Sequence, residues 1–452
     1  MKTKYILYFA VVLFLASSCK PEVNDFTPDA GSADFSTYVA VGNSLTAGYA
    51  DGALYKSGQS YGWANILSAQ LKQSGGGDFV LPVIESEQGV LPGKLVLGPS
   101  TDCLGNVSLG PVPANDGDLD PWNNHIDYAI NNLGVPGAKV GHLLFPGYGN
   151  PANLPAGLAN PYFVKFASTP DITVLEQALS MQPTFISLWI GNNDVLGYAT
   201  SGGAGSEITP VADFAGQYGY LAQNLFAGGS EGILANIPDI ANAAFFTTVP
   251  YNPIVLTDQV LVDQLNTAYA PYNAAMASLG LPYRVNWSLG ANPMVIVDKD
   301  MGMPVPEFNI RQIESNELVL LTIPQDSIKC AQWGSAKPIP DQYVLTVKEI
   351  KNVNDATEQF NNIIKQTAQD LNLAFADFNS LMKQMQGTGL VYDGITFTTA
   401  FVYGNLFSLD GIHLSPQGNA VVANYYIDAI NATYGANVPK VNISDYPPIT
   451  LP

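Results

Sequence analysis

The chain has 452 residues, of which 47% are hydrophobic and 12% are charged, and its formal net charge is −20 at pH 7. A chain of this length and hydrophobic content can bury a large core, in one large domain or in two. The excess of acidic residues argues against nucleic acid or an anionic lipid surface as a partner of the globular part.

The first residues have the pattern of a secretory signal. Two lysines precede an apolar run, Tyr5–Ala16, and two serines then lead into Cys19. The run is shorter than the roughly 20 residues needed to span a bilayer, which favours an export signal over residues 1–18. A cysteine directly after small residues resembles a bacterial lipoprotein signal, and on that resemblance Cys19 is the lipidated first residue of the mature protein. Ordinary secretion, with the cysteine removed, is the alternative.

On the lipoprotein interpretation the protein is exported and anchored to the bacterial outer membrane, on its periplasmic or its outer side. Residues 19–36 are polar and contain two prolines and several acidic residues. Such a composition predicts a flexible tether between the membrane and a globular domain.

A strand-to-helix junction follows the tether. Tyr38–Val41 predicts a short buried strand, Gly42 ends it, and Ser44 stands where a helix begins. A serine there lies at the carboxyl edge of a sheet, where open α/β folds bind ligands, and the N–H groups of a helix start favour developing negative charge. Gly-Asn-Ser is also ordinary turn sequence, and serine is a common helix N-cap, so this junction alone leaves both interpretations open.

Two further segments combine glycine and asparagine after apolar runs. Asn132–Ala138 follows Ile126–Ile130, and Leu188–Asp194 contains the end of a second run, Phe185–Ile190. A glycine can bring a bare backbone N–H close to a substrate, and an asparagine can offer a side-chain N–H beside it. A tetrahedral oxyanion needs such donors. A plain turn is the alternative for each segment.

Strands and helices alternate over most of the chain, which predicts an α/β fold with a doubly wound parallel sheet. The expected later strands are residues 126–130, 184–190, 232–238 and 374–377, and the expected helices are residues 61–73, 140–145, 172–180, 209–226, 354–371, 379–385 and 419–434. Residues 74–124 predict a long loop that carries a small hairpin or borders the ligand site.

The alternation breaks between residues 241 and 348. This insertion predicts a helix over residues 258–279 and strands over residues 284–298, 318–323 and 343–347. We interpret it as a cap or subdomain over the carboxyl edge of the sheet, where it would shape the ligand pocket. An appended hairpin far from the site is the alternative. The aromatic-rich loop over residues 387–409 is expected to line part of the same pocket.

An acidic residue stands three residues before a histidine in the segment Ser408–Gly418. A serine hydroxyl needs a neutral imidazole to take its proton, and the imidazole needs a carboxylate that fixes its tautomer. On one tight loop Asp410 can turn back to Nδ1 of His413 and leave Nε2 for a serine. A surface turn with a solvated charge is the alternative.

Cys103 and Cys330 are the cysteines that remain after Cys19. In an oxidising compartment they could pair, but the sequence alone does not show that they are close. The other two histidines, His125 and His142, have no ligand-like spacing to them. No metal site is therefore expected, and both histidines are interpreted as surface or loop residues.

Taken in order, the segments around Ser44, residues 132–138, residues 188–194 and residues 408–418 resemble the SGNH hydrolases, also called the GDSL superfamily. The resemblance extends from about residue 37 to residue 435, interrupted by the insertion, and leaves residues 436–452 as a C-terminal tail. It implies a three-layer α/β/α fold of the flavodoxin-like kind.

The resemblance also implies roles for single residues. Ser44 would be the nucleophile and would donate its backbone N–H to an oxyanion hole. Gly137 would add a second backbone N–H, and Asn193 would add its side-chain amide. Asp410 and His413 would complete the catalytic triad, and no metal or organic cofactor is implied.

The chain departs from the family pattern at Asn43, where many members have aspartate. Asn43 is not a triad position, and asparagine can still form the local hydrogen bond. The α/β-hydrolase pattern Gly-x-Ser-x-Gly fits less well, because Thr46 occupies its last glycine position and the acid of that fold lies well upstream of its histidine.

The implied function is an exported serine esterase that hydrolyses carboxylic esters through an acyl-serine intermediate. The aromatic-rich surroundings favour an acyl ester, as in a lipase-like or general acyl esterase. The alternatives are a carbohydrate O-acetylesterase and a catalytically silent, surface glycan-binding lipoprotein. The expected partners are an acyl lipid or an acetylated glycan as substrate and the membrane through Cys19.

Overall fold

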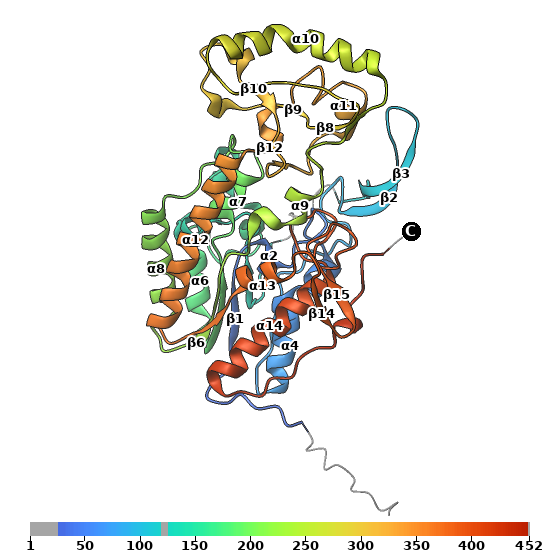
Figure 1. The fold of residues 1–452 in the computed structure, drawn as a ribbon. Coiled ribbons are helices and arrows are strands. Elements are labelled where there is room, and N and C mark those ends of the chain that lie inside the picture. Colours follow the sequence, from blue (N-terminus) through green and yellow to red (C-terminus); the bar gives the residue numbers. More distant parts are fainter. Residues whose placement is uncertain (1–25, 119–124, 451–452) are drawn as a thin grey trace, which may run out of the picture.

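The computed structural model describes residues 26–118 and 125–450, so the predicted signal and Cys19 lie outside the described residues. Its centre is a parallel sheet with the strand order β13-β6-β5-β1-β4 (Figure 1). The strands are β1 (Tyr38–Gly42), β4 (Asn132–Gly134), β5 (Phe185–Trp189), β6 (Glu231–Ala235) and β13 (Ala374–Ala376). If the five strands are numbered one to five in chain order and read from β4, their order in the sheet is 2-1-3-4-5, as in flavodoxin-like folds. This order confirms the predicted doubly wound sheet.

Helices cover both faces of this sheet (Figure 1). One face carries α4 (Trp63–Gln73) and α14 (Pro416–Tyr434), and the other carries α6 (Val174–Ser180), α8 (Val211–Phe226) and α12 (Val347–Asp370). The central strands are buried on both sides, which is why their sequences are continuous apolar runs. The three-layer arrangement is therefore as expected.

Shorter elements connect these layers. They are α2 (Ser44–Ala47), α3 (Lys56–Ser60), α5 (Pro161–Val164), α7 (Asn193–Ala199), α13 (Phe378–Gln384), the 3₁₀ helix η1 (Val140–Leu144), and the hairpins of β2 (Leu95–Thr101) with β3 (Val107–Pro113) and of β14 (Leu390–Tyr392) with β15 (Ile395–Phe397). The hairpin of β2 and β3 is the one predicted in the long loop.

The second strand of the sheet differs from the prediction. The apolar run Ile126–Ile130 is irregular chain, and β4 begins only at Asn132, which pairs with Ala40. The backbone of this segment bonds to other loops. Ile126 donates its N–H to the carbonyl of Lys165 (2.8 Å), and Asn131 donates its N–H to the carbonyl of Val80 (2.8 Å). Nδ2 of Asn131 donates to the carbonyl of Tyr38 (3.2 Å).

The insertion forms a lobe above the carboxyl ends of the strands (Figure 1). It contains two hydrophobic clusters of its own, one around Met276 and Trp287 and one around Met294 and Ile296. Its elements are α9 (Ala244–Thr247), β7 (Ile254–Leu256), α10 (Gln259–Ser278), β8 (Gly290–Asn292), β9 (Val295–Val297), β10 (Ile310–Gln312), β11 (Leu318–Val319), α11 (Gln325–Lys329) and β12 (Val344–Leu345). The predicted helix is present, whereas the long strand expected over residues 284–298 divides into β8 and β9, which pair with different partners.

A buried ion cluster ties this lobe to α12. Arg311 donates from Nε to Asp298 (2.7 Å) and from both Nη atoms to Glu317 (2.7 and 2.6 Å). Glu317 also accepts the backbone N–H of Val347, the first residue of α12 (3.0 Å). The cluster satisfies the buried charges by direct hydrogen bonds, which a buried ion pair requires to be tolerated.

A disulfide joins the lobe to the hairpin of β2 and β3. Cys103, in the tip between the two strands, is bonded to Cys330 at the end of α11, and their Cα atoms lie 6.4 Å apart. Lys329 also contacts Asp102 (3.0 Å). The pairing that the sequence left open is therefore present.

Both ends of the described chain pack against the domain. Within the segment expected as a tether, Phe35 is buried in the main core and Ser32 donates its N–H to the carbonyl of Tyr434 (2.9 Å). Residues 29–36 are therefore docked and do not form a free tether, because their apolar side chains reach the end of α14. The C-terminal tail is docked as well, with Val438 and Ile443 buried.

Glu349 lies in the first turn of α12, beside the lobe. Its carboxylate accepts the N–H and the hydroxyl of Thr346 (2.8 and 2.9 Å). Burial raises the pKa of Glu349 to about 7; the Thr346 hydrogen bonds lower it, and the nearby carboxylates of Asp341 and Asp300 add to the increase.

Because the folded-state pKa of Glu349 lies above the ordinary value of 4.5, the folded protein binds this proton more tightly than the unfolded chain. The bound proton on Glu349 therefore stabilises the folded state, and this contribution is complete at pH values below the unfolded pKa and is lost as the pH rises through about 7. We expect Glu349→Gln, which keeps an oxygen acceptor for Thr346, to raise the melting temperature at pH 8 more than at pH 5. Glu176→Gln, in the exposed capping box of α6, is the control. Equal shifts at both pH values would contradict the prediction.

Candidate active site

Ser44 begins the short helix α2, directly after β1. Asn43 is the N-cap of this helix, and its Oδ1 accepts the N–H of Leu45 (3.0 Å), so asparagine performs the local capping at the position where the family often has aspartate. A Cβ on Gly42 would lie 2.2 Å from Oγ1 of Thr46 and 2.5 Å from the carbonyl of Trp189. Only glycine therefore lets the chain turn here and present Ser44.

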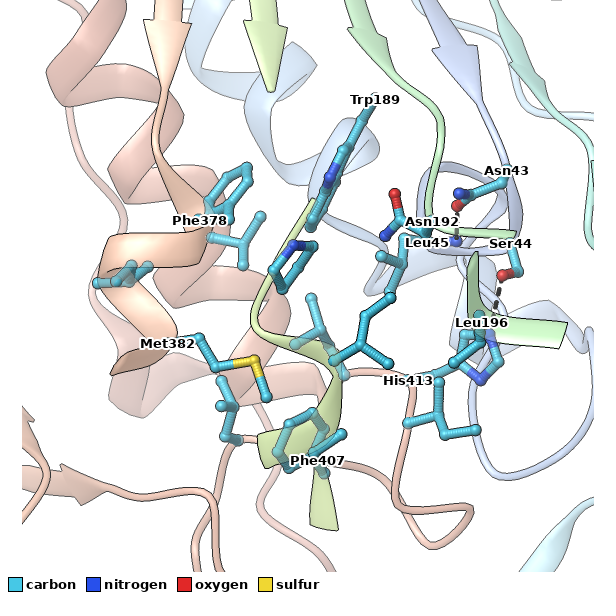
Figure 2. A pocket seen from close by; sticks show the side chains of 18 of the residues that line it. Asn43, Ser44, Leu45, Trp189, Asn192, Leu196, Phe378, Met382, Phe407 and His413 are labelled. Carbon is cyan, nitrogen blue, oxygen red and sulfur yellow. Dashed lines mark hydrogen bonds between the residues drawn. The ribbon is translucent and has the colours of Figure 1, made fainter. Parts of the chain in front are cut away.

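The structure brings Ser44, His413 and Asp410 into one hydrogen-bonded chain. Nε2 of His413 lies 2.9 Å from Oγ of Ser44, and Nδ1 lies 2.8 Å from Oδ2 of Asp410 (the first of these bonds is drawn in Figure 2). When Nδ1 carries the imidazole proton and donates it in a hydrogen bond to the carboxylate, the lone pair of Nε2 faces the serine hydroxyl. A serine can be activated as a nucleophile in this geometry.

The carboxylate of Asp410 is fully engaged. It accepts the backbone N–H groups of Ile412 (2.9 Å), His413 (2.8 Å) and Gly52 (2.9 Å) in addition to the imidazole. Burial alone would raise the pKa of Asp410, but the charge of His413 and the hydrogen bonds from His413 and Ile412 outweigh it and hold the pKa well below its usual range. Asp410 is therefore ionised at neutral pH.

The insertion supports the loop that carries the triad. Gly411 has a φ of +75°, and a Cβ there would lie 2.9 Å from the backbone nitrogen of Phe245 and 3.2 Å from Leu321. The N–H of Phe245, in α9, donates to the carbonyl of Gly411 (2.9 Å). The insertion thus holds the turn between Asp410 and His413 from outside.

Asp51 supports the same loop from the other side, although in the sequence it stands in an ordinary Asp-Gly turn and was not predicted to have a role. Its carboxylate accepts the N–H of Leu409 (2.9 Å) and the hydroxyl of Tyr55 (2.6 Å), and its own N–H donates to Oγ of Ser408 (2.9 Å). Burial raises the pKa of Asp51, and the hydrogen bonds from Tyr55 and Leu409 oppose that effect.

Aromatic rings cover the imidazole. The Tyr49 ring lies 4.7 Å from the His413 ring, and Tyr162 packs edge-on against Tyr49 at 6.4 Å. Of the aromatic residues near Tyr162, Phe163 and Phe166 are buried in the core instead. The Tyr49 ring limits the access of water to the face of His413 that it covers.

The predicted oxyanion donors come from two loops that touch each other. Asn193 begins α7, and its Nδ2 donates to the carbonyl of Ala138 (2.9 Å), next to Gly137. An amide nitrogen carries two hydrogens, so one remains for a ligand. Gly137 has a φ of +79°, and no atom lies within 4 Å of the place where a Cβ would stand.

Other side chains of the segments 132–138 and 188–194 hold the two donor loops in place. Asn132 donates from Nδ2 to the carbonyl of Thr46 (2.7 Å) and accepts the N–H of Gly134 (2.9 Å). Asp194 is buried and accepts the N–H of Val140 (3.0 Å) and the hydroxyl of Thr209 (2.8 Å). These side chains position the donors and do not reach the cavity.

A cavity with an open mouth extends from Ser44 and His413 between the strand ends and α13 (Figure 2). Its wall is mostly apolar and consists of Leu45, Trp189, Leu196, Pro238, Ile240, Ala243, Phe378, Leu381, Met382, Met385, Leu406, Phe407, Ile412, Leu414 and Val422. Ala243 is the only contribution of the insertion, and Phe407 is the only aromatic residue from the loop over residues 387–409. The body of the domain, more than the expected cap, therefore shapes this cavity.

Within residues 26–118 and 125–450, no group of three or more His, Cys, Asp or Glu side chains is placed to hold a metal ion. No helix in this part of the chain is long and apolar enough to cross a membrane. His125 contacts Asp127 (2.9 Å) in a loop, and His142 is half-buried in η1.

A family model described as GDSL-like Lipase/Acylhydrolase matches residues 262–426. The match begins inside the insertion and includes Asp410 and His413, but it does not extend to Ser44. The comparison with curated proteins gives no match.

Three solved structures resemble the chain at 11% identity. The first is a protein from Parabacteroides merdae described as a GDSL-like lipase, with a TM-score of 0.35, and the match covers 89% of this chain and 99% of that one. The second is an extracellular lipase from Streptomyces rimosus, with a TM-score of 0.33 and coverages of 88% and 99%. The third is a gut microbial diltiazem-metabolizing enzyme, with a TM-score of 0.28 and coverages of 89% and 49%. The chain thus spans about half the length of the third. At these TM-scores the similarities carry no argument about substrate.

The family match covers most of the insertion, α12, β13, α13, the histidine loop and the first part of α14. The other four strands of the flavodoxin-like parallel sheet lie before the match, and Ser44 stands at the carboxyl edge of that sheet. Residues 262–426 are thus similar to the GDSL-like lipases and acylhydrolases, and this similarity supports a hydrolase that acts on carboxylic esters.

Proposed function

We propose that this protein is an exported serine esterase that hydrolyses acyl esters through Ser44, His413 and Asp410. The observation that carries the proposal is the hydrogen-bonded chain from Asp410 through His413 to Ser44 at the mouth of an apolar cavity. Each member has the chemical type that its role requires: an ionised carboxylate, an imidazole and a hydroxyl.

In the proposed reaction, Nε2 of His413 takes the hydroxyl proton as Ser44 attacks the ester carbonyl. The negative charge on the carbonyl oxygen is met by the backbone N–H groups of Ser44 and Gly137 and by the amide of Asn193. His413 then returns the proton to the leaving alcohol, which leaves an acyl-serine. Water, activated by His413 in the same way, releases the acid. Asp410 holds the tautomer throughout and stabilises the imidazolium.

The cavity supports an acyl group longer than acetyl. Its wall beyond the reacting serine offers aliphatic, aromatic and thioether side chains, and burial of an alkyl chain there contributes about 0.8 kcal/mol for each CH₂ group. A carbohydrate O-acetylesterase would not use this volume. Lipase-like or general acyl-esterase activity is therefore the first candidate, ahead of deacetylation and of glycan binding without turnover.

We further propose that the mature protein is lipidated at Cys19 and anchored to the outer membrane. The support is the sequence alone: a basic start, a short apolar core and small residues directly before the cysteine.

The triad is tested with p-nitrophenyl esters from acetyl to dodecanoyl. His413→Ala should lower kcat by roughly 10⁴-fold or more, because the serine loses its base. His125→Ala removes a histidine from a loop and should retain activity. Ser44→Ala should be equally inactive, and kcat/KM of the parent should rise from acetyl to octanoyl. Near-normal turnover by His413→Ala would refute the triad, and an optimum at acetyl would favour the deacetylase.

Asp51 is predicted to act as a positioning residue for the triad loop. Because its φ is +53°, Asp51→Gly removes the carboxylate without backbone strain, whereas Asp51→Asn keeps an acceptor for Leu409. We expect kcat to fall roughly 10- to 100-fold in Asp51→Gly, with a smaller change in KM, and to recover largely in Asp51→Asn. Equal activity of the two variants would show that the hydrogen bond to Leu409 does not position the loop.

The anchor is tested by growing cells that express the full chain with a labelled fatty acid. Cys19→Ala should abolish the label, since it removes the thiol to which a lipid is attached. Cys103→Ala, which changes a cysteine of the folded domain, should retain it. A label that persists in Cys19→Ala would refute the anchor without affecting the esterase proposal.

A further inference from the structure

We infer that the acyl group of the substrate is an aliphatic chain of medium length, which lies across the carboxyl edge of the sheet and ends against α13. Met382 and Met385 would then limit the length of the chain. The inference deepens the proposed function and rests on it, because it assigns the apolar cavity beside Ser44 to one part of the ester.

The cavity follows the sheet from strand to strand. Its wall includes residues that come shortly after four strands that are neighbours in the sheet, namely Ser44 after β1, Asn192 after β5, Pro238 after β6 and Phe378 after β13. Figure 2 shows the same direction, with Ser44 on one side of the cavity and Phe378 and Met382 on the other. The cavity therefore runs along the sheet edge, away from the proposed nucleophile.

The two ends of the cavity differ in their exposure. Beside the triad, the lining residues Leu45, Leu196 and Ile412 are partly exposed. On the side of α13, Met382 is 7% exposed and Met385 is 1% exposed, and both belong to the main hydrophobic core. The mouth of the cavity therefore lies at the triad, and the packed core closes the end at α13.

A closed end suits the acyl group better than the alcohol. In the proposed reaction the alcohol leaves first, while the acyl group stays bonded to Ser44 until water enters. An alcohol held at the closed end could leave only past the acyl-serine, whereas an alcohol at the mouth departs directly into solvent. His413, which would return the proton to the alcohol, is partly exposed at that mouth. The acyl chain is therefore the group that takes the closed end.

The far wall of the cavity is suited to aliphatic carbon. The rings of Trp189 and Phe378 stack with their centroids 4.4 Å apart, and the indole N–H of Trp189 is already used by the carbonyl of Asn236 (3.0 Å). The thioethers of Met382 and Met385 are apolar and flexible, so they adapt to the end of an alkyl chain. A polar group on the acyl chain would lose its hydration here without a matching hydrogen bond.

The sheet gives the scale of the chain that fits. β13 is the third strand from β1, and neighbouring strands lie about 4.8 Å apart, so the ends of β1 and β13 are about 14 Å apart. Three bonds of an extended chain advance about 3.5 Å, so this span equals roughly 12 bonds. The side chains of α13 occupy its last part. We therefore expect the best acyl chain to have roughly 8 to 10 carbons.

The experiment measures kcat/KM of the purified protein for p-nitrophenyl esters from acetyl to hexadecanoyl. We expect a maximum near octanoyl or decanoyl and a decrease of about 10-fold or more at hexadecanoyl, because a longer chain must displace packed side chains. In Met382→Ala and in Met385→Ala the maximum should move to esters that are longer by roughly two or three carbons, since each change vacates space at the closed end. In Met382→Trp it should move to shorter esters. The ratio of variant to parent at each length cancels differences in ester solubility.

Met276→Ala is the matched control. Met276 is fully buried in a hydrophobic cluster of the insertion and is not part of the cavity wall. This change should lower the melting temperature about as much as the alanine variants of α13, without moving the maximum. A shift that also appears in Met276→Ala would show that lost stability, and not the shape of the cavity, is its cause.

Ethyl octanoate and octyl acetate test which part of the ester enters the cavity. They are isomers that carry the long chain on opposite sides of the ester group. We expect kcat/KM for ethyl octanoate to be higher by about 10-fold or more, because only its chain would be buried in the closed end.

A preference for octyl acetate would assign the cavity to the alcohol and overturn the inference. Rates that do not fall up to hexadecanoyl would overturn the closed end, and a maximum that stays in place in all three variants of α13 would overturn the role of its methionines. These results leave the esterase proposal intact. The absence of turnover on every ester would overturn the proposed function itself, and with it the inference.

Discussion

The geometry of the proposed catalytic triad depends on the hydrogen bonds around one carboxylate. Asp410 accepts two N–H groups from its own turn, one from Gly52 and one from the imidazole. These bonds fix the orientation of the turn relative to Ser44, because the Gly52 bond joins the histidine loop to the chain just after the nucleophile. The same bonds keep the carboxylate charged despite its burial. A single side chain therefore sets both the position and the electrostatics of the histidine.

The surrounding chain holds this turn from two directions. Asp51 forms hydrogen bonds with Ser408 and Leu409, just before the turn that carries Asp410 and His413. Phe245 of the insertion donates its N–H to the carbonyl of Gly411, inside that turn. The insertion is fastened in turn to α12 by the Arg311 cluster and to the hairpin of β2 and β3 by the disulfide. The insertion contributes only Ala243 to the cavity wall, but it contacts the loop that carries Asp410 and His413 directly through the Phe245–Gly411 hydrogen bond.

The sequence was sufficient for the sheet and for the residues at its carboxyl edge. Short apolar runs followed by glycine, asparagine or serine identify strand ends, and parallel strands place their ends together, so Ser44 and Asn193 could be expected at one edge of the sheet. The place of His413 beside Ser44 was implied by the resemblance to the SGNH hydrolases, since no strand ends at His413. Asp51 could not be found in this way. Its importance lies in the hydrogen bonds that it makes in three dimensions, whereas in sequence it is an ordinary turn residue. The strand expected over residues 126–130 is absent because the backbone of this run bonds to the loops at Lys165 and Val80, which the sequence does not reveal.

The docking of residues 29–36 has a consequence for the orientation of the molecule. These residues pack beside Tyr434, at the end of α14, and lead into the start of β1, whereas Ser44 follows the end of that strand. The described chain therefore begins at the edge formed by the amino ends of the strands, whereas the cavity lies at their carboxyl ends (Figure 1). The proposed lipid at Cys19 would thus be attached on the side of the amino ends, and the mouth of the cavity would face away from that side. An enzyme anchored in this way would meet esters that arrive from solution or from a facing surface more readily than the lipids of the membrane that holds its anchor.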